Sequence, residues 1–277
     1  MRKDFCFILG TITLLGCGAT AAAQGHSERF RAHNAEMSTL QPALISPLVA
    51  PDPRLLQYAR FSVSHEFTSS GAETVNWGNC RGGGVIVRKR FELDWAPPVY
   101  LQHNGHGADG WGDTSLLAKY RIASGNAEAG NFEVTAIVSR TLATGSHSNG
   151  GVTGSYTPVL AAGYARGHFD VIGSVGGTLP TGENVRQGRS VAWNTTVQMH
   201  ATRHIWMEME NNATFYKGGS HDGAVQNFAT PAVFYVVRKK EWKALHPWFI
   251  VDGGMQVATS SFHTYNHNIV TELRMLF

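Results

Sequence analysis

Pairs of charged side chains recur at two-residue spacing in the middle of the chain. Glu92 and Asp94 form one pair, Lys119 and Arg121 form a second, and Glu133 follows. Residues two apart in an extended strand point to the same face, so each pair presents its charges on one side. Opposite charges on adjacent strands can pair across the ladder. The spacing therefore predicts a network of ion pairs on one face of a sheet.

A second acidic pair, Glu208 and Glu210, repeats this spacing, with Trp206 on the same face. If the sheet closes into a barrel, its polar face lines the lumen. Such a face can form the selectivity lining of a channel, or it can hold the shape of the lumen without contacting a solute. Both interpretations stay open. The candidate lumen-lining residues are Glu92, Asp94, Lys119, Arg121, Glu133, Trp206, Glu208 and Glu210.

The chain contains 13 His residues, which raises the question of a metal site. His103 and His106 lie in one Gly-rich stretch with Asp109 and Asp113, and imidazole with carboxylate can bind a divalent ion. The sequence contains no tight cluster of ligands at a recognised spacing. We therefore predict no metal site and no cofactor.

Ester hydrolysis is the third chemistry that the sequence suggests. The stretch 146–150 is similar to the motif of outer-membrane barrels that hydrolyse lipid esters, in which a His and a Ser lie two residues apart on one strand. His147 and Ser148 are adjacent instead, so they would point to opposite faces. We predict no catalytic residues and no enzyme activity, and a lipid hydrolase stays the least favoured alternative.

The elements that must position these side chains are strands. Apolar and polar residues alternate with period two over much of the chain, and only 16% of residues are charged while Gly numbers 31, which favours strands joined by Gly-rich turns. We expect about twelve strands, near 58–68, 83–88, 91–100, 112–123, 131–143, 152–165, 168–178, 189–202, 204–216, 224–238, 243–258 and 267–277.

Alternation alone does not distinguish a soluble sandwich from a membrane barrel. Short connections, such as 89–90 and 166–167, broadly alternate with long ones rich in Gly, Asn and His, such as 102–110. Outer-membrane barrels alternate short periplasmic turns with longer outer loops, and their strands are about ten residues long. We therefore predict an all-β fold: a transmembrane, antiparallel, up-and-down β-barrel formed by a single copy of the chain.

The start of the chain has the order of an export signal. Charged residues 1–4 precede an apolar run over 5–15, and small residues end at Ala23. We predict a removed signal peptide over 1–23, as in Gram-negative exported proteins. An alternative is lipidation at Cys17, because residues 14–17 resemble a lipobox. The predicted domains are the signal peptide 1–23, a mostly irregular periplasmic leader 24–56 broken by prolines, and an outer-membrane barrel 57–277.

The final strand ends in an aromatic residue. Phe277 follows Ile269, Leu273 and Met275 on one face, a pattern similar to the assembly signal of outer-membrane barrels. We therefore expect the barrel-assembly machinery to act on this strand, and outer-membrane lipid to surround the barrel. The 23 basic and 20 acidic residues nearly cancel, so no nucleic-acid partner is predicted.

Two motifs resemble a family of outer-membrane transporters named for the meta-cleavage pathway of phenol degradation. Residues 112–121 match a Gly-Asp pair that opens a strand ending in Lys-Tyr-Arg, and residues 176–182 match a strand leaving through Leu-Pro-Thr-Gly. The likeness covers most of 57–277, and each motif is short. It implies a barrel in the bacterial outer membrane that passes small hydrophobic or aromatic molecules.

The expected function is thus a porin-like outer-membrane channel or transporter for passive passage of small solutes. The alternative from another class is a structural or surface-binding barrel that conducts nothing. Ion pairs across the lumen would narrow the interior, which favours a narrow channel over a wide general porin.

Overall fold

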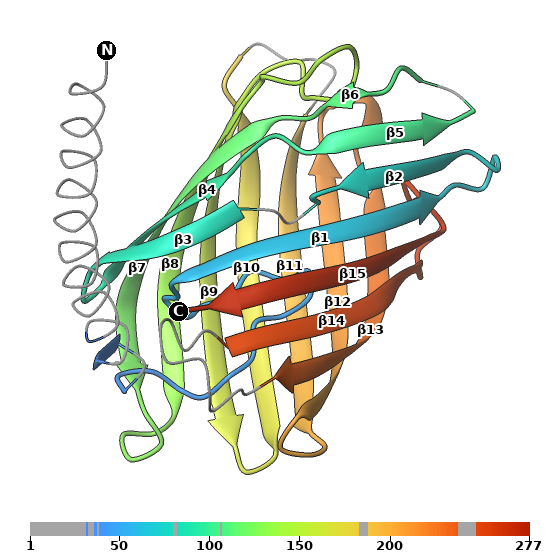
Figure 1. Ribbon diagram of the computed structural model, residues 1–277. Coiled ribbons are helices and arrows are strands. Elements are labelled where there is room, and N and C mark those ends of the chain that lie inside the picture. Colours follow the sequence, from blue (N-terminus) through green and yellow to red (C-terminus); the bar gives the residue numbers. More distant parts are fainter. Residues whose placement is uncertain are drawn as a thin grey trace, which may run out of the picture.

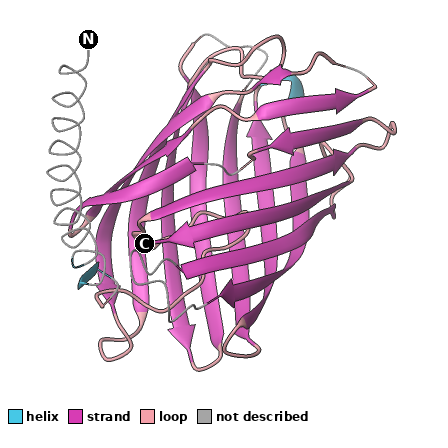
Figure 2. Ribbon diagram, viewed as in Figure 1, coloured by secondary structure: helices cyan, strands magenta, loops and turns pink. Residues whose placement is uncertain are grey.

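Strands dominate the computed structural model, which describes residues 32, 36–37, 39–79, 82–105, 107–182, 188–237 and 248–277 (Figures 1 and 2). The predicted signal peptide, 1–23, lies outside the described residues. Among the residues described, no helix is both long and apolar enough to cross a membrane. The strands are β1 (Tyr58–Phe67), β2 (Glu73–Trp77), β3 (Gly82–Arg88), β4 (Phe91–Ala96), β5 (Tyr100–Asn104), β6 (Gly110–Trp111), β7 (Thr114–Gly125), β8 (Phe132–Leu142), β9 (Ser155–Arg166), β10 (Phe169–Pro180), β11 (Arg189–His200), β12 (Ile205–Lys217), β13 (Val225–Val237), β14 (Trp248–Ala258) and β15 (His267–Leu276), and η1 (Gly219–His221) is a 3₁₀ helix.

The described strands occupy twelve positions in the wall, because three positions hold two strands each. β2 and β3 pair with opposite ends of β1, β4 and β5 pair with β3 and β2, and β7 and β6 pair with β4 and β5. Residues 97–99 separate β4 from β5 and include two prolines, which have no N–H to donate to the ladder.

The sheet closes on itself through β1 and β15. These strands pair antiparallel from Tyr58 opposite Leu276 to Phe67 opposite His267. All the pairings between described strands are antiparallel, and from β7 to β15 each strand pairs with the next in sequence. The prediction of an antiparallel up-and-down barrel of about twelve strands is therefore confirmed.

The two ends of the barrel differ in their connections. At the end where β1 begins, which we call the short-turn end, the turns 89–90, 167–168 and 201–204 are short. This end lies toward the lower left of Figure 1. Loops 143–154 and 259–266 at the opposite end are longer. The turn 126–131 is longer than its short-turn neighbours, and the connection 238–247 lies outside the described residues.

The strands present an apolar face outward and a largely polar face inward. Leu93 is 44% exposed while its neighbour Glu92 is fully buried, and Met209 is 53% exposed while Glu210 is fully buried. The alternation predicted from sequence is thus realised in the wall. Since water would be an unfavourable neighbour for such a contiguous apolar exterior, this face needs an apolar surrounding.

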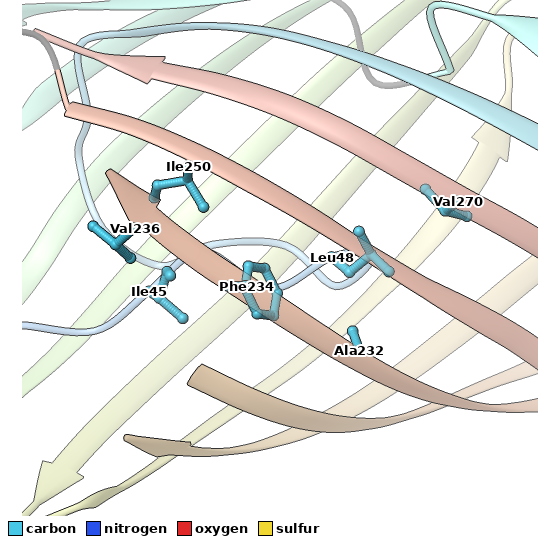
Figure 3. Close-up of a cluster of buried hydrophobic side chains, with 7 residues drawn as sticks. All are labelled: Ile45, Leu48, Ala232, Phe234, Val236, Ile250 and Val270. Atoms are coloured by element: carbon cyan, nitrogen blue, oxygen red, sulfur yellow. The ribbon is translucent and has the colours of Figure 1, made fainter. Parts of the chain in front are cut away.

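The interior holds residues 41–57, which form neither helix nor strand and which we call the interior segment. In Figure 3, Ile45 and Leu48 from this segment lie beside Phe234 of β13 and Ile250 of β14, in one buried apolar cluster. β13 buries apolar side chains on the inward face where it meets the segment, whereas most strands bury polar ones there.

The interior segment includes residues 41–56 of the predicted periplasmic leader, 24–56. These residues lie inside the barrel, where inward-facing polar groups of the wall bind their backbone and where Leu48 and Leu55 are fully buried. The periplasmic position of the leader stays a prediction. Prolines at 42, 47, 51 and 53 prevent regular structure but do not prevent a chain from folding within a cylinder that satisfies its backbone groups.

Candidate functional site

The first predicted ion pair joins β4 to β7 inside the barrel. Glu92 stands opposite Lys119 in the ladder, and Lys119 Nζ lies 2.9 Å from Glu92 Oε1 and 3.8 Å from Asp94 Oδ2. Lys119 also donates to the backbone carbonyl of Arg54, 3.2 Å away, and Glu92 accepts a hydrogen bond from the N–H of Leu56. The pair therefore anchors the end of the interior segment as well as the wall.

The second ion pair links β7 to β8. Arg121 Nε lies 2.7 Å from Glu133 Oε1, and Glu133 is fully buried. The same guanidinium donates to Gln41 Oε1 at 2.6 Å and to the Lys89 carbonyl at 3.2 Å. Arg121 thus holds the start of the interior segment beside the turn 89–90.

The acidic pair on β12 is satisfied by backbone N–H groups of the segment. Glu208 accepts from the N–H of Leu48 at 3.0 Å, and Glu210 accepts from those of Val49 and Ala50, each at 2.9 Å. Hydrogen bonds to a carboxylate are among the stronger ones in proteins. This pair therefore fixes the middle of the segment against the wall opposite β4 and β7.

Gln198 on β11 extends that contact. Its Nε2 donates to Glu208 at 2.6 Å and to the carbonyl of Ile45 at 3.0 Å. Trp206, the remaining predicted residue, is partly buried, packs against the cluster of Figure 3 and lies 3.4 Å from the His200 ring, centre to centre. Trp206 is thus a packing residue near the short-turn end.

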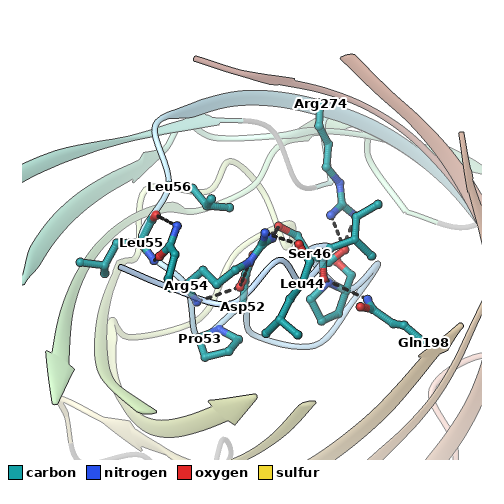
Figure 4. A network of polar contacts seen from close by, with 12 residues as sticks. Leu44, Ser46, Asp52, Pro53, Arg54, Leu55, Leu56, Gln198 and Arg274 are labelled. Carbon is teal, nitrogen blue, oxygen red and sulfur yellow. Dashed lines mark hydrogen bonds and ion pairs between the residues drawn. The ribbon is translucent and has the colours of Figure 1, made fainter. Parts of the chain in front are cut away.

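Inside the segment, Asp52 and Arg54 fold the chain back on itself. Figure 4 shows Arg54 directed at Asp52, Ser46 and the carbonyl of Leu44, and the Arg54 Nη2 to Asp52 Oδ2 distance is 2.8 Å. Burial acts to raise the pKa of Asp52, but the adjacent Arg54 guanidinium outweighs it and holds that pKa below its ordinary range. Asp52 therefore stays ionised and keeps the fold-back closed.

Arg274 on the last strand reaches the same fold-back from the wall. It donates to the carbonyls of Ser46 at 2.6 Å and Pro47 at 3.0 Å (Figure 4). Its Nε lies 2.6 Å from Glu272 and 3.0 Å from Asp252, so two carboxylates balance its charge. Thr135 on β8 donates to the carbonyl of Pro53, so residues from β4, β7, β8, β11, β12 and β15 hold the segment across the barrel.

Sequence reasoning missed Asp52, Arg54, Gln198 and Arg274. The one signal in the sequence is a charged pair flanking a proline at 52–54, within a stretch otherwise low in charge. Their partners are mostly backbone groups, which every residue carries, so spacing gave no indication of them.

Two cavities border Asp94, and the first of them lies beside the segment. One of about 270 Å³ lies between the segment and the inner wall, lined in part by Leu56, Ile137 and Val159. A second of about 240 Å³ reaches residues at the break between β4 and β5, among them Pro97 and Val99.

The loop residues considered for metal binding make loop contacts instead. His103 lies 3.1 Å from Thr74 and 2.7 Å from Asn149 through its ring nitrogens, and Asp109 accepts from the His103 N–H. Asp113 accepts N–H bonds from residues 144, 145 and 151 and so organises the loop 143–154. Within the described ranges, no group of three or more candidate ligands lies together, and His106 is outside them.

His147 and Ser148, from the hydrolase-like stretch, are exposed in the loop 143–154. His147 has a left-handed backbone conformation with φ of 57°, as expected of a tight loop and not of a strand. This stretch therefore lacks the strand geometry that would place a His and a Ser on one face.

Comparison with known proteins gives the fold. No family model and no curated protein matches the chain. A crystal structure of an outer-membrane channel from Pseudomonas putida F1 matches with a TM-score of 0.56 and 12% identity, covering 84% of this chain and 100% of that one. The DcaP channel of Acinetobacter baumannii matches with a TM-score of 0.36 and 10% identity over 81% and 96% of the two chains, too low to indicate one fold.

The protein therefore belongs to the class of closed antiparallel β-barrels, with twelve strand positions, and its fold is similar to that of the Pseudomonas structure. The resemblance to the transporter family named for phenol degradation stays a prediction.

Proposed function

We propose that this protein is an outer-membrane channel for passive passage of small molecules, with the interior segment narrowing its lumen. The observation that carries the proposal is the separation of faces in a closed barrel: exposed Leu93 and Met209 outside, buried charged Glu92 and Glu210 inside. A closed barrel satisfies every backbone group of its wall, which is what a sheet needs in hydrocarbon. The structural neighbour, itself an outer-membrane channel, supports the same proposal.

A finer proposal concerns the kind of solute that passes through the channel. The segment and the ion pairs Glu92–Lys119 and Arg121–Glu133 lie inside the short-turn half and narrow it, which disfavours a wide aqueous pore. The remaining space of about 270 Å³ has Leu117, Ile137 and Val159 in its lining. This supports small solutes with apolar parts, in agreement with the family resemblance.

The roles we propose for the lining residues differ along the barrel. Arg121, Glu133, Glu208 and Glu210 hold the segment or the wall, whereas Asp94 and Lys119 also border the larger cavity. We also propose that β15, which is followed by Phe277, is the strand recognised during assembly into the membrane.

The alternative is a barrel that conducts nothing, and one observation favours it: the segment is bound from both sides of the interior. Planar-bilayer conductance and proteoliposome swelling distinguish the two. We expect slow entry of small solutes through the full chain and fast entry through a variant lacking residues 41–56. A folded full-length barrel that admits no solute would support the alternative.

A further inference from the structure

The two cavities meet at one carboxylate. Both are lined by Tyr58, Arg60, Asp94 and Leu117, so these residues form the junction between the space beside the interior segment and the space at the wall break. Asp94 is the acidic member of the four, and its side chain is only 3% exposed.

Asp94 lacks a hydrogen-bond donor. Neither of its oxygens accepts a hydrogen bond from any described residue. The nearest cation in its ion pairs, Lys119 Nζ, is 3.8 Å away and lies closer to Glu92, at 2.9 Å. A buried carboxylate is costly unless donors satisfy it, so an unsatisfied one that borders a cavity points to a ligand that brings a donor.

The neighbouring backbone is shaped to leave this carboxylate room. Gly84 pairs with Asp94 on one side and with Tyr58 on the other. A Cβ at position 84 would lie 2.3 Å from Asp94 Oδ1 and 2.6 Å from the Tyr58 ring, closer than atoms can approach. Glycine therefore preserves the space occupied by both side chains.

Local charge favours a donor over an acceptor in the ligand. Asp52 is paired with Arg54. The other cations that line the larger cavity, Arg60, Lys119 and Arg274, each lie closer to another carboxylate, at 3.7 Å from Glu272, 2.9 Å from Glu92 and 2.6 Å from Glu272. Asp94 shares Lys119 with Glu92, at the longer distance of 3.8 Å. Glu92, two residues away on the same face, adds repulsion toward any anion that approaches. A ligand with an ammonium or hydroxyl group would balance this site, and a carboxylate would not.

The remaining lining suits a compact apolar body. Leu56, Leu117, Ile137 and Val159 border the larger cavity. Its volume of about 270 Å³ exceeds the ~150 Å³ of an apolar cavity that admits benzene. A single ring with a short polar arm fits these dimensions.

We propose that this junction is a binding subsite for small molecules that join one hydrogen-bond-donating head to a compact apolar body. The head, an ammonium or a hydroxyl, binds Asp94, and the body lies against Leu117 and Ile137. The route by which a ligand enters rests on the proposed channel function, but binding at the junction does not.

Four probes that share one ring test the subsite: benzylamine, benzyl alcohol, toluene and benzoate. Binding to the purified full chain is measured by saturation-transfer NMR with titration. We expect benzylamine and benzyl alcohol to bind more tightly than toluene, and benzoate not to bind. Asp94→Asn should weaken benzylamine about tenfold or more, because a hydrogen bond to a charged group is lost, and should leave toluene unchanged.

Asp170→Asn is the matched control, since Asp170 is also fully buried on the inner face but binds His200 at 2.7 Å and lines neither cavity. It should leave all four affinities unchanged. Leu117→Phe keeps the carboxylate and fills the cavity, so it should weaken all three binding probes even if Asp94→Asn fails to fold, which heat-dependent gel mobility reports. Equal benzylamine affinity in the wild type and in Asp94→Asn, or tightest binding by benzoate, would overturn the subsite. Failure of conductance with binding intact would instead count against the channel alone.

Discussion

Arg274, three residues before the end of the chain, donates a hydrogen bond of 2.6 Å to the backbone carbonyl of Ser46. The bond ties the last strand to a segment that precedes the first. Arg274 is buried and also pairs with Asp252 and Glu272. The same side chain therefore holds the interior segment in place and balances the charge of two carboxylates in the wall.

Replacing Arg274 with Gln should destabilise the barrel by about 3–5 kcal/mol, because it removes the cation nearest to the buried Asp252 and leaves the buried Glu272 with only the more distant Arg60, 3.7 Å away. Unfolding in lipid vesicles with urea measures the loss. Arg274→Lys is the control: it keeps the charge but not the forked geometry, so it should lose less. Unchanged stability and unchanged protease resistance of the interior segment in Arg274→Gln would contradict this coupling.

Glu92 and Lys119 should behave as an energetically coupled pair. Lys119→Met leaves two buried carboxylates beside an apolar side chain and should cost about 3–5 kcal/mol. Adding Glu92→Gln should recover part of that loss, giving a coupling energy of about 0.5–3 kcal/mol in a double-mutant cycle. Strict additivity of the two single changes would show that the 2.9 Å contact contributes nothing.

The acidic pair on β12 should control how tightly the middle of the segment is held. Glu208→Gln with Glu210→Gln replaces the carboxyl acceptors of the N–H groups of residues 48–50 by weaker amide acceptors, which should cost about 1–2 kcal/mol overall. Hydrogen exchange of those amides should then accelerate roughly tenfold or more. Asp170→Asn, which leaves the segment's partners intact, serves as the control, and equal exchange in both variants would reject the assignment.

The proposed contact between the outer face and the membrane predicts that the cost of a charged substitution there depends on its depth in the membrane. Leu160 and Tyr156 are each 48% exposed on the outward face of β9, Leu160 in its middle and Tyr156 near its end. Leu160→Arg should cost about 2–4 kcal/mol of folding free energy in vesicles, and Tyr156→Arg about 0–1 kcal/mol. A barrel surrounded by water would tolerate both equally, so similar small costs would argue against a hydrocarbon surrounding.

Asp52 should make the fold-back sensitive to acid. Its pKa in the folded protein lies below the ordinary 3.8, so its contribution is fully present above that value and is lost as the pH falls below it. The stability difference between the wild type and Asp52→Asn should be constant above about pH 5 and should shrink below about pH 4. A stability difference that grows on acidification would contradict the prediction that ionised Asp52 stabilises the fold-back.

Strand positions and the pairing of Glu92 with Lys119 were predictable, because period-two alternation places the members of each charged pair on one face of neighbouring strands. β2 was missed, since its short run 73–77 lies between turns and pairs with only part of β1. β6 and most of β5 were also missed, because the Gly-rich stretch 102–110 was assigned to a loop and 91–100 to a single strand. The position of the interior segment within the barrel was not predictable, because the segment has no periodicity. Its position depends on contacts such as Val49 with Glu210, 161 residues apart, between a side chain and a backbone N–H that any residue except proline would offer.

The anchors of the interior segment are synthesised at very different times. Lys119 and Thr135 belong to the first half of the chain, whereas Gln198, Glu210 and Arg274 come later, the last of them at its very end. The interior segment is synthesised before the strands of the wall. It can therefore reach its final position only when the barrel is complete. A nascent barrel that stops before its last hairpin would have an unbound interior segment and inward-facing charged side chains without their partners. This state would distinguish an unfinished barrel from a complete one.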